Sequence, residues 1–127
     1  MEAGFFKLML SSNLTISDET EIKNLRASNQ AVVNALSLSS VHIRNGVRFL
    51  NNSALNPDGQ TIFMQNSDVA EISHAHFEDN GQIDIKLDLG TLMISDSNFT
   101  NGARNHIFGL ESDITLKNVR IYDSGSE

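Results

Sequence analysis

The stretch from Val69 to Asn101, VAEISHAHFEDNGQIDIKLDLGTLMISDSNFTN, contains one sequence unit and most of a second copy of it. The first copy has ISH at 72–74 and FED at 77–79, and the second has ISD at 94–96 and FTN at 99–101. Both the Ile and the Phe therefore recur after 22 residues. A repeat of about 20–50 residues is typical of architectures in which similar units stack on each other.

The same unit fits the chain five times. It consists of apolar-x-apolar-x-[Asp/Asn/His], two or three residues, and then [Phe/Ile]-x-[Asn/Asp]. Its Phe or Ile anchors lie 27, 28, 22 and 22 residues apart, at Ile22, Phe49, Phe77, Phe99 and Ile121. The apolar-x-apolar steps have period two, which predicts short strands with one face inward. A third alternating segment lies between successive units, at 32–36, 62–64, 83–89 and 107–110.

Three short strands per repeat form one coil, and a single coil cannot bury its own inward row. Stacking the coils at the strand spacing of about 4.8 Å places Phe77 on Phe99 and Ile72 on Ile94. The sequence therefore predicts an all-β fold, a parallel β-helix solenoid of about five coils of 22–28 residues. Residues 1–127 are expected to form a single domain or fragment, with coils beginning near 12, 39, 67, 90 and 112. A left-handed hexapeptide helix is the rival fold, but its strict six-residue period is absent.

Each strand is closed by a polar residue where the chain must turn, and we interpret these residues as structural. Asn and Asp tolerate a left-handed backbone and form hydrogen bonds to the nearby backbone. Stacked coils would align these residues into two ladders along the axis. The first ladder comprises Asp18, Asn45, His74, Asp96 and Asn118. The second comprises Asn24, Asn51, Asp79, Asn101 and Asp123.

The net charge of −7 argues against a nucleic-acid partner or an anionic membrane surface, since both attract a basic face. The chain has no Cys, so it has neither a disulfide framework nor thiolate chemistry. The first ten residues are too short for a signal peptide or a membrane span, and we expect no membrane span. The Asn-Pro-Asp-Gly turn within 53–60 predicts a loop that protrudes from the stack.

The five units resemble the right-handed parallel β-helix, or pectin-lyase-like, superfamily over about residues 12–123. Within them, 49–80 looks most like the repeat of polymorphic outer-membrane proteins and related adhesins, which has Phe-x-x-Asn followed by a Gly-Gly-Ala-Ile-like strand start. FLNN at 49–52 and FEDN at 77–80 match its first half, and GQTI at 59–62 and GQI at 81–83 are degraded versions of its second. FTNG at 99–102 departs at its last residue. The resemblance implies a right-handed coil and an extracellular or cell-surface location.

Enzymes of this superfamily carry acidic and basic residues on the outer face of one sheet. The nearest match is Asp84, Lys86 and Asp88, which alternation places outward, with His106 one coil further on. Two carboxylates, a Lys and a His can in principle cleave a polysaccharide by acid/base chemistry. A solvated outer face explains the same pattern. The sequence also lacks the Asn-Thr-Asp, Gly-Asp-Asp and Gly-His-Gly signatures of polygalacturonases.

His74 and His76, two residues apart, are the candidates for a metal site, because side chains at i and i+2 of a strand point the same way. No spacing supplies a third ligand, so we expect neither metal nor cofactor. Asn-x-Ser/Thr patterns make Asn13 and Asn98 candidate glycosylation sites. Asn51 also has the pattern, but it belongs to a corner ladder.

These features favour a non-enzymatic structural or adhesive β-helix segment of an extracellular surface or filament-forming protein. The alternative is a fragment of a β-helical polysaccharide lyase or glycoside hydrolase. Open strand edges at the ends of a stack predict that further coils, or other copies in end-to-end association, are its partners. A glycan or cell-surface ligand is the further partner that the side faces suit.

Overall fold

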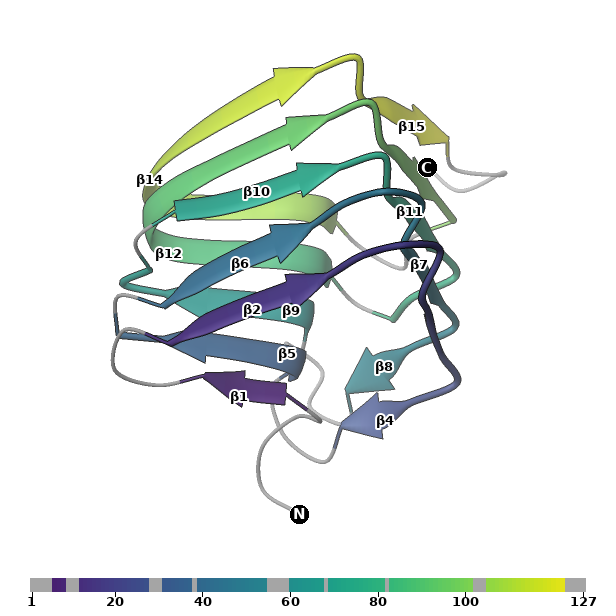
Figure 1. Ribbon diagram of the computed structural model, residues 1–127, viewed down its shortest axis with the longest axis horizontal. Helices are drawn as coiled ribbons and strands as arrows, with labels where there is room; N and C mark the ends of the chain where they lie inside the picture. Colours follow the sequence, from purple (N-terminus) through teal and green to yellow (C-terminus); the bar gives the residue numbers. More distant parts are fainter. Residues whose placement is uncertain are drawn as a thin grey trace.

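The structure is a computed structural model that describes residues 6–8, 12–27, 31–37, 39–54, 60–67, 69–81, 83–101 and 105–122. The described residues form 15 strands and contain no helix. All strand pairs are parallel, and the strands stack into a β-solenoid of about four turns (Figure 1). The predicted all-β solenoid is confirmed.

The coil has three sides, which we call side 1, side 2 and side 3. Side 1 comprises β2 (Asn13–Ile16), β6 (Ser40–Ile43), β10 (Val69–Ser73) and the second halves of β12 (Ile83–Ser95) and β14 (Asn105–Lys117). Side 2 comprises β3 (Glu21–Lys23), β7 (Arg48–Leu50), β11 (His76–Glu78), β13 (Asn98–Thr100) and β15 (Arg120–Tyr122). Side 3 comprises β1 (Phe6–Leu8), β5 (Ala31–Leu36), β9 (Gln60–Gln65) and the first halves of β12 and β14.

The chain climbs from the N-terminal end to the C-terminal end with a right-handed sense. In Figure 1 the side 1 strands run left to right on the near face, and the side 3 strands return right to left behind them. This is the hand that parallel crossover connections adopt. The described residues make about four complete turns. The second half of β14, together with β15, only begins a fifth turn, because the described residues end at Tyr122. The expected five coils are corrected accordingly.

The core is the inward column that the repeat predicted. The register pairs Ile22 with Phe49, Phe49 with Phe77, Phe77 with Phe99, and Phe99 with Ile121. The rings of Phe49 and Phe77 stack with centroids 4.8 Å apart, and those of Phe77 and Phe99 with centroids 4.7 Å apart. On side 1 the register aligns Ile16, Ile43, Ile72, Ile94 and Leu116. Burying this apolar surface is the main source of stability in a stack without disulfides.

β12 and β14 each run 13 residues around the corner between side 3 and side 1, so sides 1 and 3 form one continuous sheet. The repeat did not predict a left-handed residue at this corner. Four residues there have positive φ: Ser37, Asn66, Leu89 and Glu111. A Cβ on Gly90 would lie 2.9 Å from the carbonyl oxygen of Ser67 on the preceding coil, so this corner requires a glycine where the coils approach closely.

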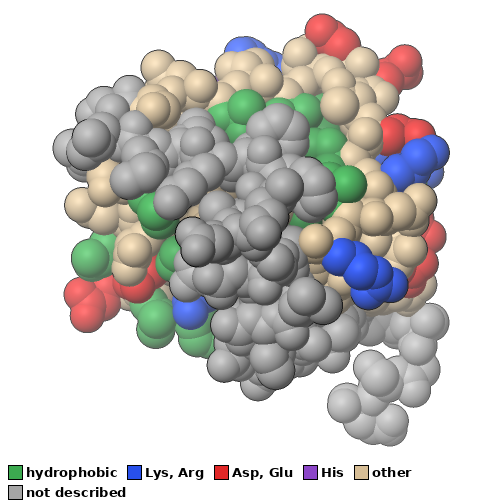
Figure 2. Space-filling view, turned by 90° about the horizontal axis from the view of Figure 1, so that it is seen from below, with side chains coloured by type: hydrophobic (Ala, Val, Ile, Leu, Met, Phe, Trp, Pro, Cys, Tyr) green, Lys and Arg blue, Asp and Glu red, His purple; other side chains and the backbone are tan. Residues whose placement is uncertain are grey.

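Two further strand pairings were not predicted. β1 extends side 3 below β5, and β4 (Arg26–Ala27) pairs with β8 (Ser53–Ala54) to form a small separate sheet. Residues 55–59 of the expected protruding loop lie outside the described residues, so that prediction stays open. Figure 2 looks onto the N-terminal end of the stack, where charged side chains of the described residues gather along the rim.

Candidate functional site

The polar residues at the strand ends occupy the two corners on either side of side 2. Nine of the ten predicted ladder residues are described, and all nine have φ between 49° and 63°. They are Asp18, Asn45, His74, Asp96 and Asn118 at the first corner, and Asn24, Asn51, Asp79 and Asn101 at the second. Asp123 lies outside the described residues. The left-handed conformation reverses the chain direction and carries a steric cost that Asn and Asp bear best.

Side-chain hydrogen bonds join some of these corner residues from coil to coil. The amide of Asn45 donates to Asp18 at 3.2 Å, and that of Asn51 donates to Asn24 at 2.9 Å. Higher in the stack, Asn118 donates to Asp96 at 3.0 Å. His74 contributes a more distant contact, with its Nε2 4.0 Å from a carboxylate oxygen of Asp96. The corners are exposed, so these bonds align the coils more than they add stability.

A second polar network lies inside the coil, beside the Phe column. Asn52 donates through its Nδ2 to the carbonyl oxygen of Ile22 at 2.8 Å, and Asn80 donates to that of Phe49 at 3.0 Å. Asn80 also accepts the backbone N–H of Asn52 at 2.9 Å. These bonds tie each Asn side chain to the backbone of the preceding coil and supply an acceptor for the N–H of the buried Asn52.

This inner network ends in a buried pair of side chains, Asp84 and His106. Asn80 donates to Oδ1 of Asp84 at 3.0 Å, and Oδ2 of Asp84 lies 2.5 Å from Nδ1 of His106. The two side chains are only 2% and 5% exposed. The imidazole of His106 also packs edge-on against Phe99, with centroids 5.7 Å apart.

The expectation that Asp84 lies on the outer face is wrong, and His106, expected close to it, is buried as well. Simple alternation around the inward residue Ile85 would direct Asp84 to solvent. However, the ladder pairs Ile83 and Ile85 with their neighbours and skips Asp84 between them, so the strand is irregular there. Both Asp84 and its counterpart Val32 are almost fully buried. The irregularity turns Asp84 and His106 toward the core, where neither side chain is open to a substrate.

Lys86 and Asp88 do lie on the outer face of side 3, half-buried, as alternation predicts. The four candidate catalytic residues are therefore divided between the interior and the outer face. The ammonium group of Lys86 lies 5.7 Å from the ring centroid of Phe63 and 5.8 Å from that of Phe108. This cation–π arrangement across three coils was missed, and the signal for it was the aromatic residue at the equivalent position of each neighbouring coil.

His74 and His76 do not lie on one strand, which corrects the premise of a shared metal site. β10 ends at Ser73 and β11 begins at His76, and His74 occupies the corner between them. Their partners also differ, because Nε2 of His76 lies 3.0 Å from the carboxylate of Glu78. Among the described residues, no three His, Cys, Asp or Glu side chains converge on a point where they could hold a metal ion.

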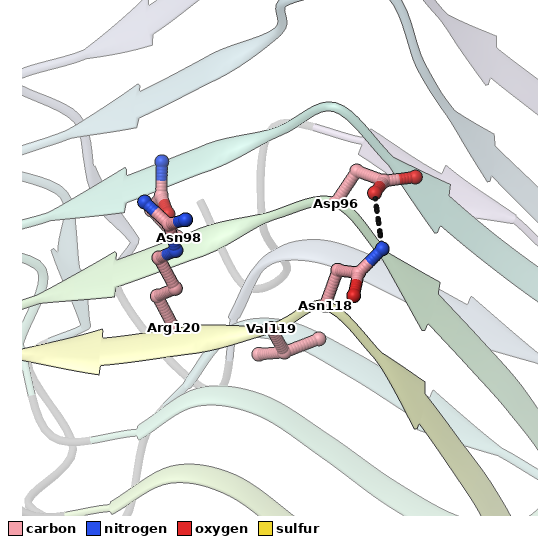
Figure 3. Close-up of a pocket in the computed structure, with 5 residues that line it drawn as sticks. All are labelled: Asp96, Asn98, Asn118, Val119 and Arg120. Atoms are coloured by element: carbon pink, nitrogen blue, oxygen red, sulfur yellow. Dashed lines mark hydrogen bonds between the residues drawn. The ribbon is translucent and has the colours of Figure 1, made fainter.

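The outer face of side 2 carries a row of mixed charge, formed by Glu21, Arg48, His76, Asn98 and Arg120. Arg48 and Glu21 form an ion pair at 2.9 Å across adjacent coils. At the C-terminal end of this row, Asn98 and Arg120 lie side by side (Figure 3). With Val119 and the hydrogen-bonded corner pair Asp96 and Asn118, they line an open depression of about 470 Å³.

Two smaller depressions lie on the outer face of side 1. One of about 80 Å³ is lined by His42, Ile43, Arg44, Glu71 and Ser73. The other, of about 290 Å³, is lined by Glu71, Ile72, Ser73, Met93 and Ser95. They share Glu71 and Ser73, so together they form a shallow trough along the stack. Of the candidate glycosylation sites, Asn13 and Asn98 are both exposed, and their modification stays a prediction.

Comparison with known proteins leaves the family open. No protein-family model matches this sequence, and no curated protein matches it either. The resemblance to pectin-lyase-like and adhesin repeats therefore rests on the motifs and the fold. Within the described part of the chain, no helix has the length and apolar character needed to cross a membrane.

Proposed function

We propose that this chain is a non-enzymatic structural or adhesive β-helix segment of an extracellular surface or filament-forming protein. One observation carries the proposal: the acid/base pair best placed for chemistry, Asp84 with His106, is sealed in the interior. There it continues a chain of hydrogen bonds from Asn52 and Asn80 that links successive coils. This is the arrangement expected of a group that holds coils together.

The outer faces support the adhesive part of the proposal. Their side chains form parallel rows with one residue per coil, about 4.8 Å apart. The charged and polar row on side 2 and the trough on side 1 both run along the stack. An extended polar ligand such as a glycan of a cell surface can contact several coils at once, and weak contacts of this kind add up. The resemblance to adhesin repeats points to the same location outside the cell.

The decisive experiment measures turnover and binding on one panel of soluble and insoluble polysaccharides. We expect retention of the protein on at least one insoluble member and no release of reducing or unsaturated ends. Arg48→Ala, on the side 2 row, and Glu71→Ala, in the side 1 trough, separate the two faces as the retaining surface. Lys23→Ala is the control on side 2, because it removes an exposed charge from outside the row that Arg48 occupies and contacts that row only through its 3.3 Å ion pair with Glu21.

Release of sugar that disappears in Lys86→Ala or Asp88→Ala and persists in Lys23→Ala would overturn the proposal. It would establish the alternative, a fragment of a polysaccharide lyase or hydrolase acting on the outer face of side 3. Failure of every panel member to retain the protein would overturn the adhesive part and leave the structural part.

A further inference from the structure

The two ends of the stack differ in how much apolar surface they leave open. At the C-terminal end, Leu116 is 49% exposed and Ile121 is 50% exposed, although they occupy the inward rows of Ile94 and Phe99. At the N-terminal end, the corresponding Ile16 and Ile22 are each only 7% exposed. Among the described residues, an apolar face is therefore exposed at the C-terminal end, and the N-terminal end shows no equally exposed counterpart.

The free edge of β14 bounds this apolar face on side 1. The carbonyl oxygen of Lys117 accepts the N–H of Asp96, so it points toward β12. Backbone groups of successive residues in a parallel strand point to opposite neighbours. The N–H and C=O groups of Ile114 and Leu116 therefore point away from the stack, toward the open edge.

The side chains along this edge are self-complementary about Thr115. Asp113, Thr115 and Lys117 face solvent, whereas Ile114 and Leu116 continue the inward rows. If a second strand of the same sequence runs antiparallel with Thr115 opposite Thr115, then Asp113 lies opposite Lys117. Ile114 then lies opposite Leu116, and these are the residues whose backbone groups are free to pair. Opposite charges and matched apolar residues at such positions stabilise an antiparallel pair.

We propose that a second copy of this chain docks on the C-terminal end through a two-fold axis that passes by Thr115. The axis is normal to side 1, so the inward rows of both copies stay inward and their cores join. The same rotation brings β15 of each copy, with its exposed Ile121, toward the second copy. The contact uses one surface twice and therefore closes as a dimer, whereas a head-to-tail contact would grow into a filament.

This inference rests on the proposed structural role, and the following experiment separates the two. Light-scattering mass is measured across a concentration series for the wild-type chain and four variants. The wild-type chain is expected to reach twice its 14.0 kDa mass and to grow no further. Thr115→Asp places two carboxylates about 5 Å apart on the axis and should raise the dissociation constant at least about tenfold. Lys117→Asp should do the same by facing Asp113 of the second copy.

Two variants serve as controls. Thr15→Asp changes the exposed residue of the same row at the opposite end and should leave the dimer intact. The charge swap Asp113→Lys with Lys117→Asp should restore the dimer that Lys117→Asp weakens, which a merely structural defect would not allow. Circular dichroism should show that each variant is folded, because all substituted positions are exposed.

A wild-type monomer at every concentration would overturn the dimer. It would not decide the proposed function, which the polysaccharide assay tests separately. Species that grow beyond two copies would overturn it in favour of head-to-tail assembly. A dimer that Thr115→Asp and Lys117→Asp leave unchanged would place the contact elsewhere and overturn it as well.

Discussion

Phe77 and Ile121 occupy the same row of the same repeat, yet their surroundings are opposite. Phe77 lies between Phe49 and Phe99 and is completely buried, whereas Ile121 lies on the last coil and is half exposed. A second contrast has a different origin: the irregularity of β12 turns Asp84 into the interior, whereas Asp88, four residues further along the strand, remains on the outer face. Position in the repeat sets where a side chain points wherever the strand is regular, and the neighbouring coils decide whether that side chain is buried.

The largest effect is expected at Phe77. Phe77→Asp places a charge in the apolar column, where neither water nor a partner compensates it, and should abolish folding. Ile121→Asp makes a comparable change at the half-exposed end and should leave the stack folded. Far-ultraviolet circular dichroism with thermal unfolding tests the pair. Loss of structure in both variants, or in neither, would show that the contrast between the middle and the end of the stack is wrong.

The buried Asp84 should come next. Asp84→Ala removes the buried carboxylate that His106 and the amide of Asn80 contact, at a cost of roughly 3–5 kcal/mol in the free energy of unfolding. Asp88→Ala removes a carboxylate from the outer face and should change that free energy by less than about 0.5 kcal/mol. Urea denaturation measures both. Equal destabilisation by the two variants would mean that Asp84 is open to water.

The corner residues test a smaller, local cost. Asn45 is exposed and has φ of 63°. In Asn45→Ala, the alanine must adopt the same left-handed conformation without the side-chain hydrogen bond that compensates its cost in asparagine. We expect a loss of about 1–2 kcal/mol. Asn45→Gly should cost clearly less, because glycine adopts this conformation freely. The same denaturation series distinguishes them, and a glycine variant no better than alanine would assign the cost to the lost hydrogen bond with Asp18.

The smallest effect is expected for the exposed ion pair of Arg48 with Glu21. Its geometry is good at 2.9 Å, but the side chains are 48% and 36% exposed, so solvent screens the attraction. Arg48→Ala should cost at most about 1 kcal/mol, well below the effect at the buried Asp84. A double-mutant cycle with Glu21→Ala measures the pair directly. A coupling comparable with that of Asp84 and His106 would contradict the ranking.

Much of the coil could be predicted because the repeat constrains it directly. Anchors at Phe49, Phe77 and Phe99 can stack in only one register, so their spacing predicted which residues meet across coils. The candidate site was less predictable. Asn52 and Asn80 gave a visible signal, as each follows its anchor Phe by three residues, but the sequence did not reveal that they lie inside and bond to backbone carbonyls.

The sequence by itself determined the parallel stack, because an inward row that recurs every 22–28 residues is buried only when coils lie on one another. It also determined where the corners beside side 2 fall, through the polar residues that accept a left-handed backbone. Only the tertiary structure decided the direction of Asp84 and His106, because a local irregularity of β12 and β14 overrides alternation there. The tertiary structure also decided the inequality of the two ends, since exposure depends on what covers a row and not on the residues within it.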